Sequence, residues 1–342
     1  MDIKYLGIDI AKNVFQLCGM SRAGKVLLTK RVRRDASMQV IAQIPPCTIA
    51  VEACTGAYYW HDRFTEMGHT VKIISPQFVK PFVKGQKNDG NDAEAIAIAL
   101  QQPTMRFVPP RSIEQQDIQA LHRARQRLVN HRTATVSQIR GLLLERGIPI
   151  ALSITRVRRA VPEILENADN GLSIPLRCAV NELFELVRYL DERVGYFDRE
   201  IEQIFRRSAI CQRIAQVPGV GPKTATAIMA AAGDGAEFKN GRHFAAWLGL
   251  VPRQHSSGDR RVMMGITKRG DRHLRTLLVH GARAVVRVSK NKTDRFSEWV
   301  NSVHERRGHN KAIVAVANKN ARIIWALLRH ETGYDPQSAT SH

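Results

Sequence analysis

Short runs in which hydrophobic and polar residues alternate fill the first third of the chain, a pattern typical of half-buried strands. Residues 3–11, 14–20 and 25–32 form three such runs, and short turns separate them. This spacing predicts three consecutive antiparallel strands. The periodicity then predicts a helix, a strand, a helix, a strand and a helix, at about 36–43, 48–53, 58–67, 71–75 and 91–102.

This order of elements is the layout of the α/β ribonuclease-H fold. That fold carries an acid on its first strand and another on its fourth, and Asp9 and Glu52 stand at those places. Pro103, Pro109 and Pro110 follow the last helix and mark the exit from the region. We therefore expect an N-terminal α/β domain over residues 1–110.

The middle of the chain changes to helical periodicity. From Ser112 to about Ile148, apolar residues recur every three or four positions and predict one long helix, although Arg125 and Arg132 fall in its apolar seam. A second helix shows four unbroken heptad pairs, at Val180, Leu183, Val187, Leu190, Val194, Phe197, Ile201 and Ile204. This repeat predicts a coiled coil within region 111–207. An apolar stripe requires a partner, so the helices pair with each other, with a second subunit, or with both. We favour both, and hence a homo-oligomer that is a dimer or a tetramer.

Small residues and glycines dominate after Arg207. Residues 217–225 lie between two apolar helical stretches, as in a helix-hairpin-helix. In that motif the glycines, here Gly219 and Gly221, let backbone amides approach a phosphate at a helix N-terminus. A plain Pro-Gly turn between two helices is the alternative interpretation. We expect a mainly α domain over 208–332.

The charge of the chain indicates a polyanionic partner. The 52 Lys and Arg outnumber the 31 Asp and Glu, giving a net charge of +21, and a protein of this kind binds nucleic acid in a salt-dependent manner. Residues 251–330 hold 18 Lys and Arg against 5 Asp and Glu and so form a main nucleic-acid surface, and residues 333–342 follow as a loose tail. On the first long helix His122, Arg123 and Arg127 either contact the backbone of RNA or DNA or belong to a solvated charged face. The expected contacts are Lys84, Lys87, Arg123, Arg127, Gly219, Gly221, Lys223, Arg253, Lys268 and Arg269.

Other classes of protein fit the sequence poorly. No run approaches the roughly 18–20 apolar residues of a membrane span, and no basic amphipathic segment at a terminus suggests a membrane surface. The first residues lack the layout of a signal peptide. The 5 cysteines form no CxxC pair, so we expect free thiols in a reducing cytoplasm and no zinc site.

Four acidic residues stand where an acid is out of place. Asp9 interrupts an apolar run, Glu52 ends another, and Asp89 and Asp92 open a helical stretch. A carboxylate at the buried end of a strand is costly unless a cation or a paired group compensates it. A few hard oxygen ligands of this kind suit Mg²⁺, whose remaining positions are filled by water.

The chemistry that these acids indicate is cleavage of a phosphodiester. Two metal ions held by carboxylates can neutralise the phosphate and activate an oxygen nucleophile. Asp89 and Asp92 are three residues apart and so point to one side of a helical turn. Helix capping is the alternative for this pair, but it cannot explain Asp9 inside a strand. Together the four acids predict a Mg²⁺ site that acts on nucleic acid.

Seven segments carry a resemblance to a known family, at 6–12, 51–56, 87–93, 217–221, 249–258, 266–271 and 315–326. Through them the chain resembles the transposases of insertion-sequence family 110, particularly its 1111 subgroup, a group that also includes the Piv-type invertases. The resemblance covers nearly the whole chain. It implies a RuvC-like domain whose Asp-Glu-Asp-Asp set falls on Asp9, Glu52, Asp89 and Asp92.

The same resemblance implies a coiled coil and a C-terminal domain that supplies a serine nucleophile. In such enzymes the two domains meet across subunits, and the serine forms a covalent phosphoserine with DNA. On spacing alone, the segment Ser256-Ser257-Gly258 is a turn. Ser256 and Ser257 both fit the family motif, and we favour Ser257 because it directly precedes Gly258.

The resemblance also implies a structured non-coding guide RNA that pairs with both donor and target DNA, so that base pairing reads the sequence. We therefore expect an RNA-guided recombinase of double-stranded DNA in the bacterial cytoplasm, associated with the nucleoid. Two alternatives remain. One is a RuvC-like junction-resolving nuclease in which metal-activated water attacks. The other is a non-enzymatic coiled-coil scaffold, against which the embedded acids argue.

Overall fold

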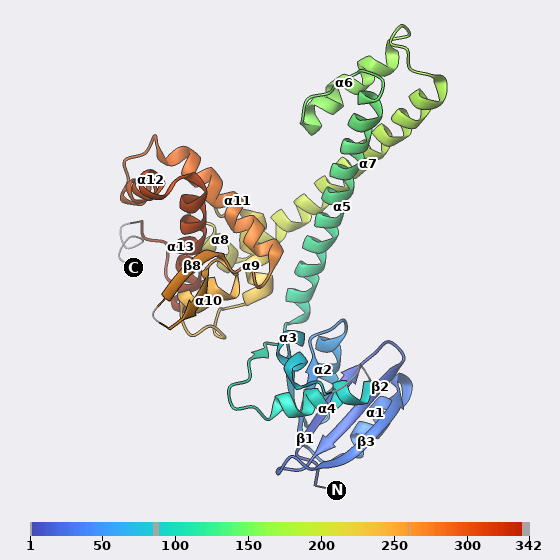
Figure 1. The fold of residues 1–342 in the computed structure, drawn as a ribbon, viewed down its shortest axis with the longest axis vertical. Coiled ribbons are helices and arrows are strands. Elements are labelled where there is room, and N and C mark those ends of the chain that lie inside the picture. Colours follow the sequence, from blue (N-terminus) through green and yellow to red (C-terminus); the bar gives the residue numbers. More distant parts are fainter. Residues whose placement is uncertain (1, 85–88, 259, 337–342) are drawn as a thin grey trace. The chain divides into compact units, whose positions relative to one another are not determined.

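In the computed structural model, residues 2–84, 89–258 and 260–336 are described, without the side chains of Asp89 and Arg261. The chain divides into two compact units, Met1–Ser112 and Ile113–His342 (Figure 1). Apart from residues 111 and 112, the predicted domains 111–207 and 208–332 both fall in the second unit, and their separation stays a prediction. No helix of the described residues is both long and apolar enough for a membrane span.

A six-stranded mixed sheet forms the centre of the first unit, in the order β3–β2–β1–β4–β5–β6. The first three strands are antiparallel, as predicted, whereas β4 is parallel to β1 and β5 is parallel to β4. A short edge strand, β6, pairs antiparallel with β5 and was not expected, because two residues before a proline give no alternating pattern. The strands span Tyr5–Ile10 (β1), Val14–Met20 (β2), Val26–Arg33 (β3), Thr48–Glu52 (β4), Thr70–Ile74 (β5) and Phe107–Val108 (β6).

Helices cover both faces of this sheet. Side chains of α1 and α2 pack on one face together with Leu6 and Ile8, in a core that includes Trp60 and Phe64. The alanines of α4 pack on the other face, against residues such as Ala50. This mixed α/β arrangement agrees with the predicted fold class. The helical segments are η1 (Arg34–Ala36), α1 (Ser37–Ala42), α2 (Ala57–Glu66), α3 (Pro76–Val79), η2 (Lys80–Phe82) and α4 (Asp89–Leu100).

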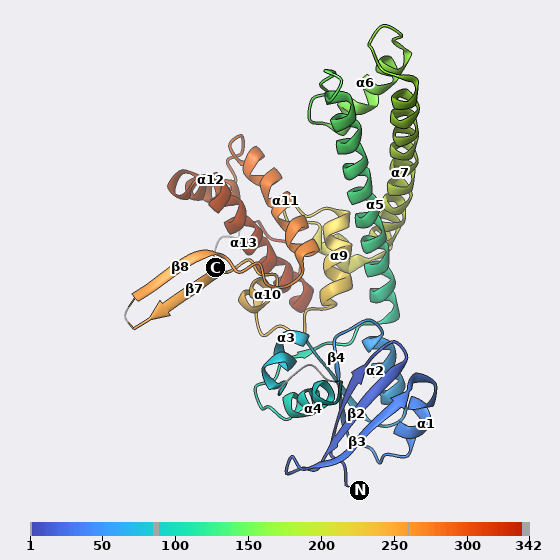
Figure 2. The same cartoon turned by 45° about the vertical axis from the view of Figure 1, so that its right-hand side comes forward.

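Two long helices, α5 (Ile113–Leu144) and α7 (Ile174–Arg207), lie side by side in the second unit (Figures 1 and 2). Arg125 on α5 pairs with Asp198 on α7 (2.5 Å), and Arg132, two turns later on α5, pairs with Asp191 (2.7 Å). Because Asp191 lies two turns before Asp198 on α7, the two helices are antiparallel. These ion pairs explain the arginines in the apolar seam. Regular coiled-coil packing and pairing with a second subunit stay predictions.

The connection between the long helices contains a helix that the sequence reading missed, α6 (Ile154–Glu166). Its buried residues Val157 and Val161 join Ile139 and Leu143 of α5 and Val180 of α7 in one core. Arg158 extends this contact, because its guanidinium also pairs with Asp191. The tip of the helical pair is therefore a packed three-helix cluster.

The rest of the second unit is mainly α, as expected, around a single large core. A two-stranded hairpin, β7–β8, leaves this helical body (Figure 2) and was not predicted. The elements are α8 (Ala209–Ile214), α9 (Pro222–Ala232), α10 (Gly241–Trp247), β7 (Pro252–Ser257), β8 (Arg260–Ile266), α11 (Arg272–Ser289), α12 (Arg295–Arg307) and α13 (His309–His330).

The last helix, α13, ties distant parts of this core together. Asn320 donates a hydrogen bond from its side chain to the carbonyl of Pro218 (2.8 Å), and Asn318 donates one to Leu250 (3.3 Å). Beyond α13, the backbone N–H of Tyr334 donates to the side chain of Gln216 (2.8 Å). The start of the segment predicted as a tail is therefore attached to the core.

Candidate active site

Two of the four predicted acids lie at equivalent positions on neighbouring strands. In the β1–β4 register Gly7 lies beside Ala50 and Ile8 beside Val51, and the same register continued by one residue brings Asp9 level with Glu52. Neighbouring strands are about 4.7–4.9 Å apart, and alternate side chains share a face. Both carboxylates therefore project from the ends of parallel strands on the face that α4 covers.

A third acid, Asp92, comes from α4, which lies unusually close to β1. A Cβ atom placed on Gly7 would be 2.3 Å from the carbonyl oxygen of Ala93 and 2.6 Å from the backbone nitrogen of Ala97. Only glycine leaves room for the helix backbone at this distance. The contact holds the middle of α4, which spans Asp89–Leu100, against β1, one residue after Asp92.

The three carboxylates share one electrostatic environment. Burial raises the pKa of Glu52 above its usual value, and the charges of Asp9 and Asp92 raise it further. All three side chains are half-buried. Like charges held together away from bulk water are stabilised by a cation, and carboxylate oxygens are ligands that a hard divalent ion accepts. The chemical type of these donors therefore suits a divalent metal.

The other residues predicted for this site, at and before the start of α4, are only partly described. The backbone of Asp89 begins α4, but its side chain lies outside the described residues, as does all of Lys87. Among the described side chains, which include Asp9, Glu52 and Asp92, no group of three or more His, Cys, Asp or Glu is positioned to hold a metal. Lys84 pairs with Glu94 on the second turn of α4 (3.6 Å).

Sequence reasoning missed a basic cavity at the same end of β1. It has a volume of about 620 Å³ and is lined by Lys12, which follows β1, and by Arg34, which follows β3. The Arg34 guanidinium lies over the ring of Trp60 at 5.1 Å, and its backbone N–H donates to Asn13 (2.9 Å). The adjacent basic residues Arg33 and Arg34 were the available signal in the sequence.

The two candidate serines lie in a strand and not in a turn, which corrects the expectation from spacing. Ser256 and Ser257 end β7, and the turn begins at Gly258. Both side chains are exposed, and because they are adjacent in a strand they project from opposite faces. Ser256 accepts a hydrogen bond from Gln254 (2.8 Å) on its own face, whereas Ser257 shares its face with His255.

The predicted phosphate-binding turn lies between α8 and α9. Gly219 has a φ of +82°, and a Cβ atom there would be 2.6 Å from the carbonyl oxygen of Gly281, so this glycine has a packing role. Gly221 precedes α9 and has open space around its Cβ position. Lys223 pairs with Asp198 of α7 (2.8 Å).

The other predicted contacts lie around the hairpin. Arg253 is on β7, and Lys268 and Arg269 follow β8; all three are exposed. Lys268 adopts a left-handed conformation (φ 54°) and donates its backbone N–H to Gly249. Arg269 accepts a hydrogen bond from Arg275 at its carbonyl (3.3 Å). This basic turn is therefore anchored to the helical body.

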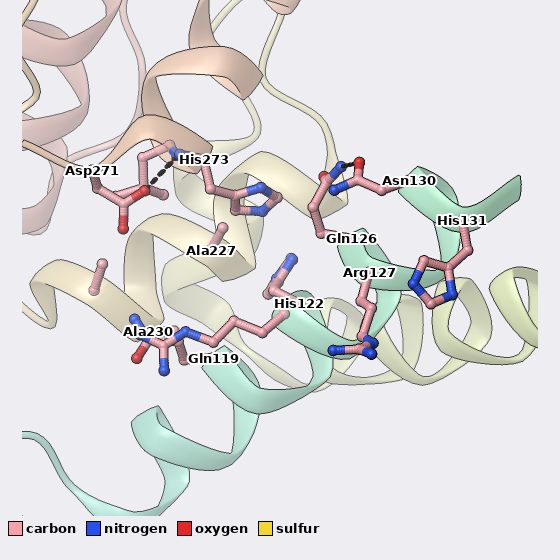
Figure 3. Close-up of a pocket in the computed structure, with 13 residues that line it drawn as sticks. Gln119, His122, Gln126, Arg127, Asn130, His131, Ala227, Ala230, Asp271 and His273 are labelled. Carbon is pink, nitrogen blue, oxygen red and sulfur yellow. Dashed lines mark hydrogen bonds between the residues drawn. The ribbon is translucent and has the colours of Figure 1, made fainter. Parts of the chain in front are cut away.

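Arg123 and Arg127 are exposed residues that line a second cavity, between α5, α9 and the start of α11. We call it the α5 cavity (Figure 3). His122, expected on a basic exposed face, is instead buried there and contacts Thr226 (3.0 Å). Burial, followed by the positive surroundings, lowers the pKa of His122 to about 4.

Comparison with known proteins gives consistent matches along the chain. Residues 6–147 match a DEDD family model of the IS110 type described as Transposase, and residues 211–298 match the model Transposase IS116/IS110/IS902 family. The Transposase for insertion sequence element IS1111A of Coxiella burnetii is 47% identical over 333 residues, covering 97% of this chain and 92% of that protein. A Probable family 20 transposase of Pseudomonas aeruginosa is 47% identical over 340 residues, covering 98% and 100%. The Pilin gene-inverting protein of Moraxella bovis is 25% identical over 353 residues, covering 98% of each chain.

Proposed function

Because this chain belongs to the IS110 family of insertion-sequence transposases, we propose that it cuts and rejoins donor and target DNA through a serine nucleophile beside a Mg²⁺ site. The family implies DNA recombination, and its DEDD domain suggests a divalent metal. The observation that carries the proposal is the shared register of Asp9 and Glu52, together with the effect of Asp92 on the pKa of Glu52.

In this proposal Asp9, Glu52 and Asp92, with Asp89 from the start of α4, hold the metal. When bound, Mg²⁺ neutralises charge on the scissile phosphate and on the leaving oxygen. Arg34 in the basic cavity at the same end of β1 binds the neighbouring backbone phosphate, since a guanidinium matches phosphate geometry. The carboxylates alone would repel DNA, so these basic groups orient the strand.

The serine step is a transesterification. The serine Oγ gives up its proton and bonds to phosphorus, the bond from phosphorus to one deoxyribose oxygen breaks, and that oxygen takes up a proton, which leaves a phosphoserine and a free DNA hydroxyl. A hydroxyl of the second DNA strand then attacks the phosphoserine, releases the serine and restores a phosphodiester, so no water is consumed. We favour Ser257 as the nucleophile. Its neighbour Ser256 faces the opposite side of β7 and already accepts a hydrogen bond from Gln254.

Family resemblance supports the remaining parts of the proposal. A structured non-coding RNA pairs with donor and target DNA and selects the sites. The protein acts as a dimer or tetramer, in which the serine of one subunit serves the carboxylates of another. The exposed basic residues Arg253, Lys268 and Arg269 beside the serines contact the nucleic-acid backbone.

The test is a covalent adduct between protein and DNA. Wild-type protein, guide RNA, Mg²⁺ and labelled DNA carrying the element ends are mixed, and the products are separated by denaturing electrophoresis. We expect an adduct with wild type and Ser256→Ala and none with Ser257→Ala or Asp9→Asn. Adduct loss only in Ser256→Ala reverses the choice of serine. Metal-dependent cleavage without any adduct would establish the junction-nuclease alternative, in which water attacks.

A further inference from the structure

The α5 cavity is a polar pocket of about 440 Å³ with an apolar floor (Figure 3). One face of α5 from Gln119 to His131 forms its wall, and the start of α11 closes one end. Buried alanines of α9, among them Ala227 and Ala230, form the floor. Small-molecule sites have volumes of about 300–1,000 Å³, so this cavity accepts one ligand the size of a nucleotide and excludes a duplex.

Two histidine rings stand over this floor, with centroids 5.6 Å apart. The hydroxyl of Thr226 donates to the carbonyl of Pro222 (2.8 Å), so the Nε2–H of His122 donates to that hydroxyl. Burial lowers the pKa of His122 to about 4, so the ring is neutral near pH 7; with its proton on Nε2, its Nδ1 is a hydrogen-bond acceptor.

The second ring, that of His273, has a buried Nε2 atom without a hydrogen-bond partner among the described residues. Burial is also the main cause that lowers the pKa of His273. Leaving a buried nitrogen without a hydrogen-bond partner is unfavourable, and a ligand that reaches this nitrogen from the cavity would supply the partner. The unmet hydrogen bond therefore points to a polar ligand.

The rim of the cavity carries unpaired positive charge. Arg125 and Arg132 of α5 pair with aspartates of α7, but Arg123 and Arg127 have no acidic partner in the part of the chain that the structure describes. A guanidinium without a carboxylate partner is a good phosphate ligand. Two of them, one helical turn apart, can hold one phosphate.

Amide groups complete the wall between the rim and the floor. Gln126 donates from its Nε2 to the Oδ1 of Asn130 (2.8 Å), which leaves the Gln126 oxygen and the Asn130 amide hydrogens for a ligand. Figure 3 shows both side chains on the α5 side of the cavity. Donor and acceptor groups mixed in this way match the edge of a nucleobase.

We propose that the α5 cavity binds one unpaired nucleotide of the nucleic-acid partner, with its phosphate at Arg123 and Arg127 and its base over the alanine floor beside the two histidines. This inference rests on the proposed function, because it takes nucleic acid as the partner. Splayed bases are held in proteins by stacking on His or Arg and by hydrogen bonds to their edges. RNA and DNA share this chemistry, and the experiment separates them.

The experiment measures fluorescence anisotropy of labelled 12-nucleotide single strands, as RNA and as DNA, with the full chain in EDTA. Arg123→Gln/Arg127→Gln should lower the affinity for the preferred strand about tenfold. The matched control, Arg156→Gln/Arg159→Gln, removes two exposed charges from α6 and should change affinity less than twofold. If both double variants lose affinity equally, the loss comes from net charge alone and the inference is wrong.

Base insertion is tested with strands that lack bases. One bound base contributes about 1–3 kcal/mol by stacking, so an abasic strand should bind wild type about tenfold more weakly than the normal strand. Arg123→Gln/Arg127→Gln should lose this discrimination while keeping the wild-type unfolding temperature. The inference is wrong if the abasic strand binds wild type as tightly as the normal strand does. Tighter binding of RNA or of DNA identifies which partner provides the nucleotide.

The same protein preparations are tested for the DNA adduct, which separates the two proposals. If an adduct forms but wild type does not distinguish normal from abasic strands, only the nucleotide site is wrong. If the strands are distinguished but no adduct forms under any condition, the proposed recombination chemistry is wrong and the nucleotide site stands.

Discussion

A single methyl group at Gly7 should separate α4 from β1 and impair the carboxylate site. In Gly7→Ala the new Cβ would lie 2.3 Å from the carbonyl oxygen of Ala93, whereas Cβ atoms essentially never come closer than 3.0 Å, so the backbones must part by about 0.7 Å or more. The obstructing atoms belong to helix backbone, which cannot rotate away as a side chain can. The whole first half of α4, including Asp92, therefore moves relative to Asp9.

Two magnitudes follow from this displacement. Overpacking of this kind costs about 1–3 kcal/mol, which corresponds to a fall of at least about 4 °C in the unfolding temperature of a domain near 100 residues. A shift of about 1 Å in a catalytic group can lower a rate about 100-fold. We therefore expect Gly7→Ala to slow adduct formation even at temperatures at which the variant is still fully folded.

The assay compares Gly7→Ala with Gly141→Ala by thermal unfolding and by the rate of adduct formation, well below either unfolding temperature. Gly141 lies in α5 with nothing within 4 Å of its Cβ position, so alanine there should stabilise the helix by about 0.5–1 kcal/mol and leave the rate unchanged. The reasoning is refuted if Gly7→Ala matches wild type in both unfolding temperature and adduct rate.

Charge substitutions test the two units separately. Glu52→Gln removes a carboxylate that Asp9 and Asp92 repel, so it should raise the unfolding temperature measured in EDTA. Adding Mg²⁺ should raise the unfolding temperature of wild type but not that of Glu52→Gln. If Mg²⁺ stabilises both proteins equally, Glu52 is not a metal ligand. Because the folded pKa of Glu52 is raised above 4.5, wild type without metal should lose stability as pH rises from about 4.5 through the raised value, and urea unfolding of Glu52→Gln should lack that slope. Asp191→Asn weakens the charged hydrogen bonds to Arg132 and Arg158, so it should lower the free energy of unfolding, measured in urea, by about 1.5–3 kcal/mol. The control Glu185→Gln, in the exposed pair with Arg188, should lower it by less than about 0.5 kcal/mol. Equal losses would contradict a stabilising role for the ion pairs of Asp191.

The sequence predicts the first unit well because its strands are short, alternating and bounded by turns. The acids on β1 and β4 were identifiable because each interrupts or ends an apolar run. The role of Gly7 was not predictable, since it depends on a helix that begins some 80 residues later in the chain. A pattern along one strand holds no information about how closely another element approaches it.

Long-range partners also explain the misses in the second unit. Arg132 looked like a flaw in an apolar seam because its partner, Asp191, is 59 residues away. His122 reads as part of a charged face, and only the packing of Thr226, 104 residues further on, shows that it is buried. The serines were expected in a turn because Ser-Ser-Gly carries turn residues, but pairing of β7 with β8 extends the strand to Ser257.

The hydrogen bond from Asn320 to Pro218 has a consequence for synthesis of the protein. The ribosome makes α13 after α8 to α12, yet the buried face of α13 fills the core that these helices share. The α5–α7 pair can form while translation continues, whereas the body that carries the serine hairpin lacks its closing helix until α13 has been translated. Premature termination before α13 should therefore yield an unfinished, aggregation-prone fragment.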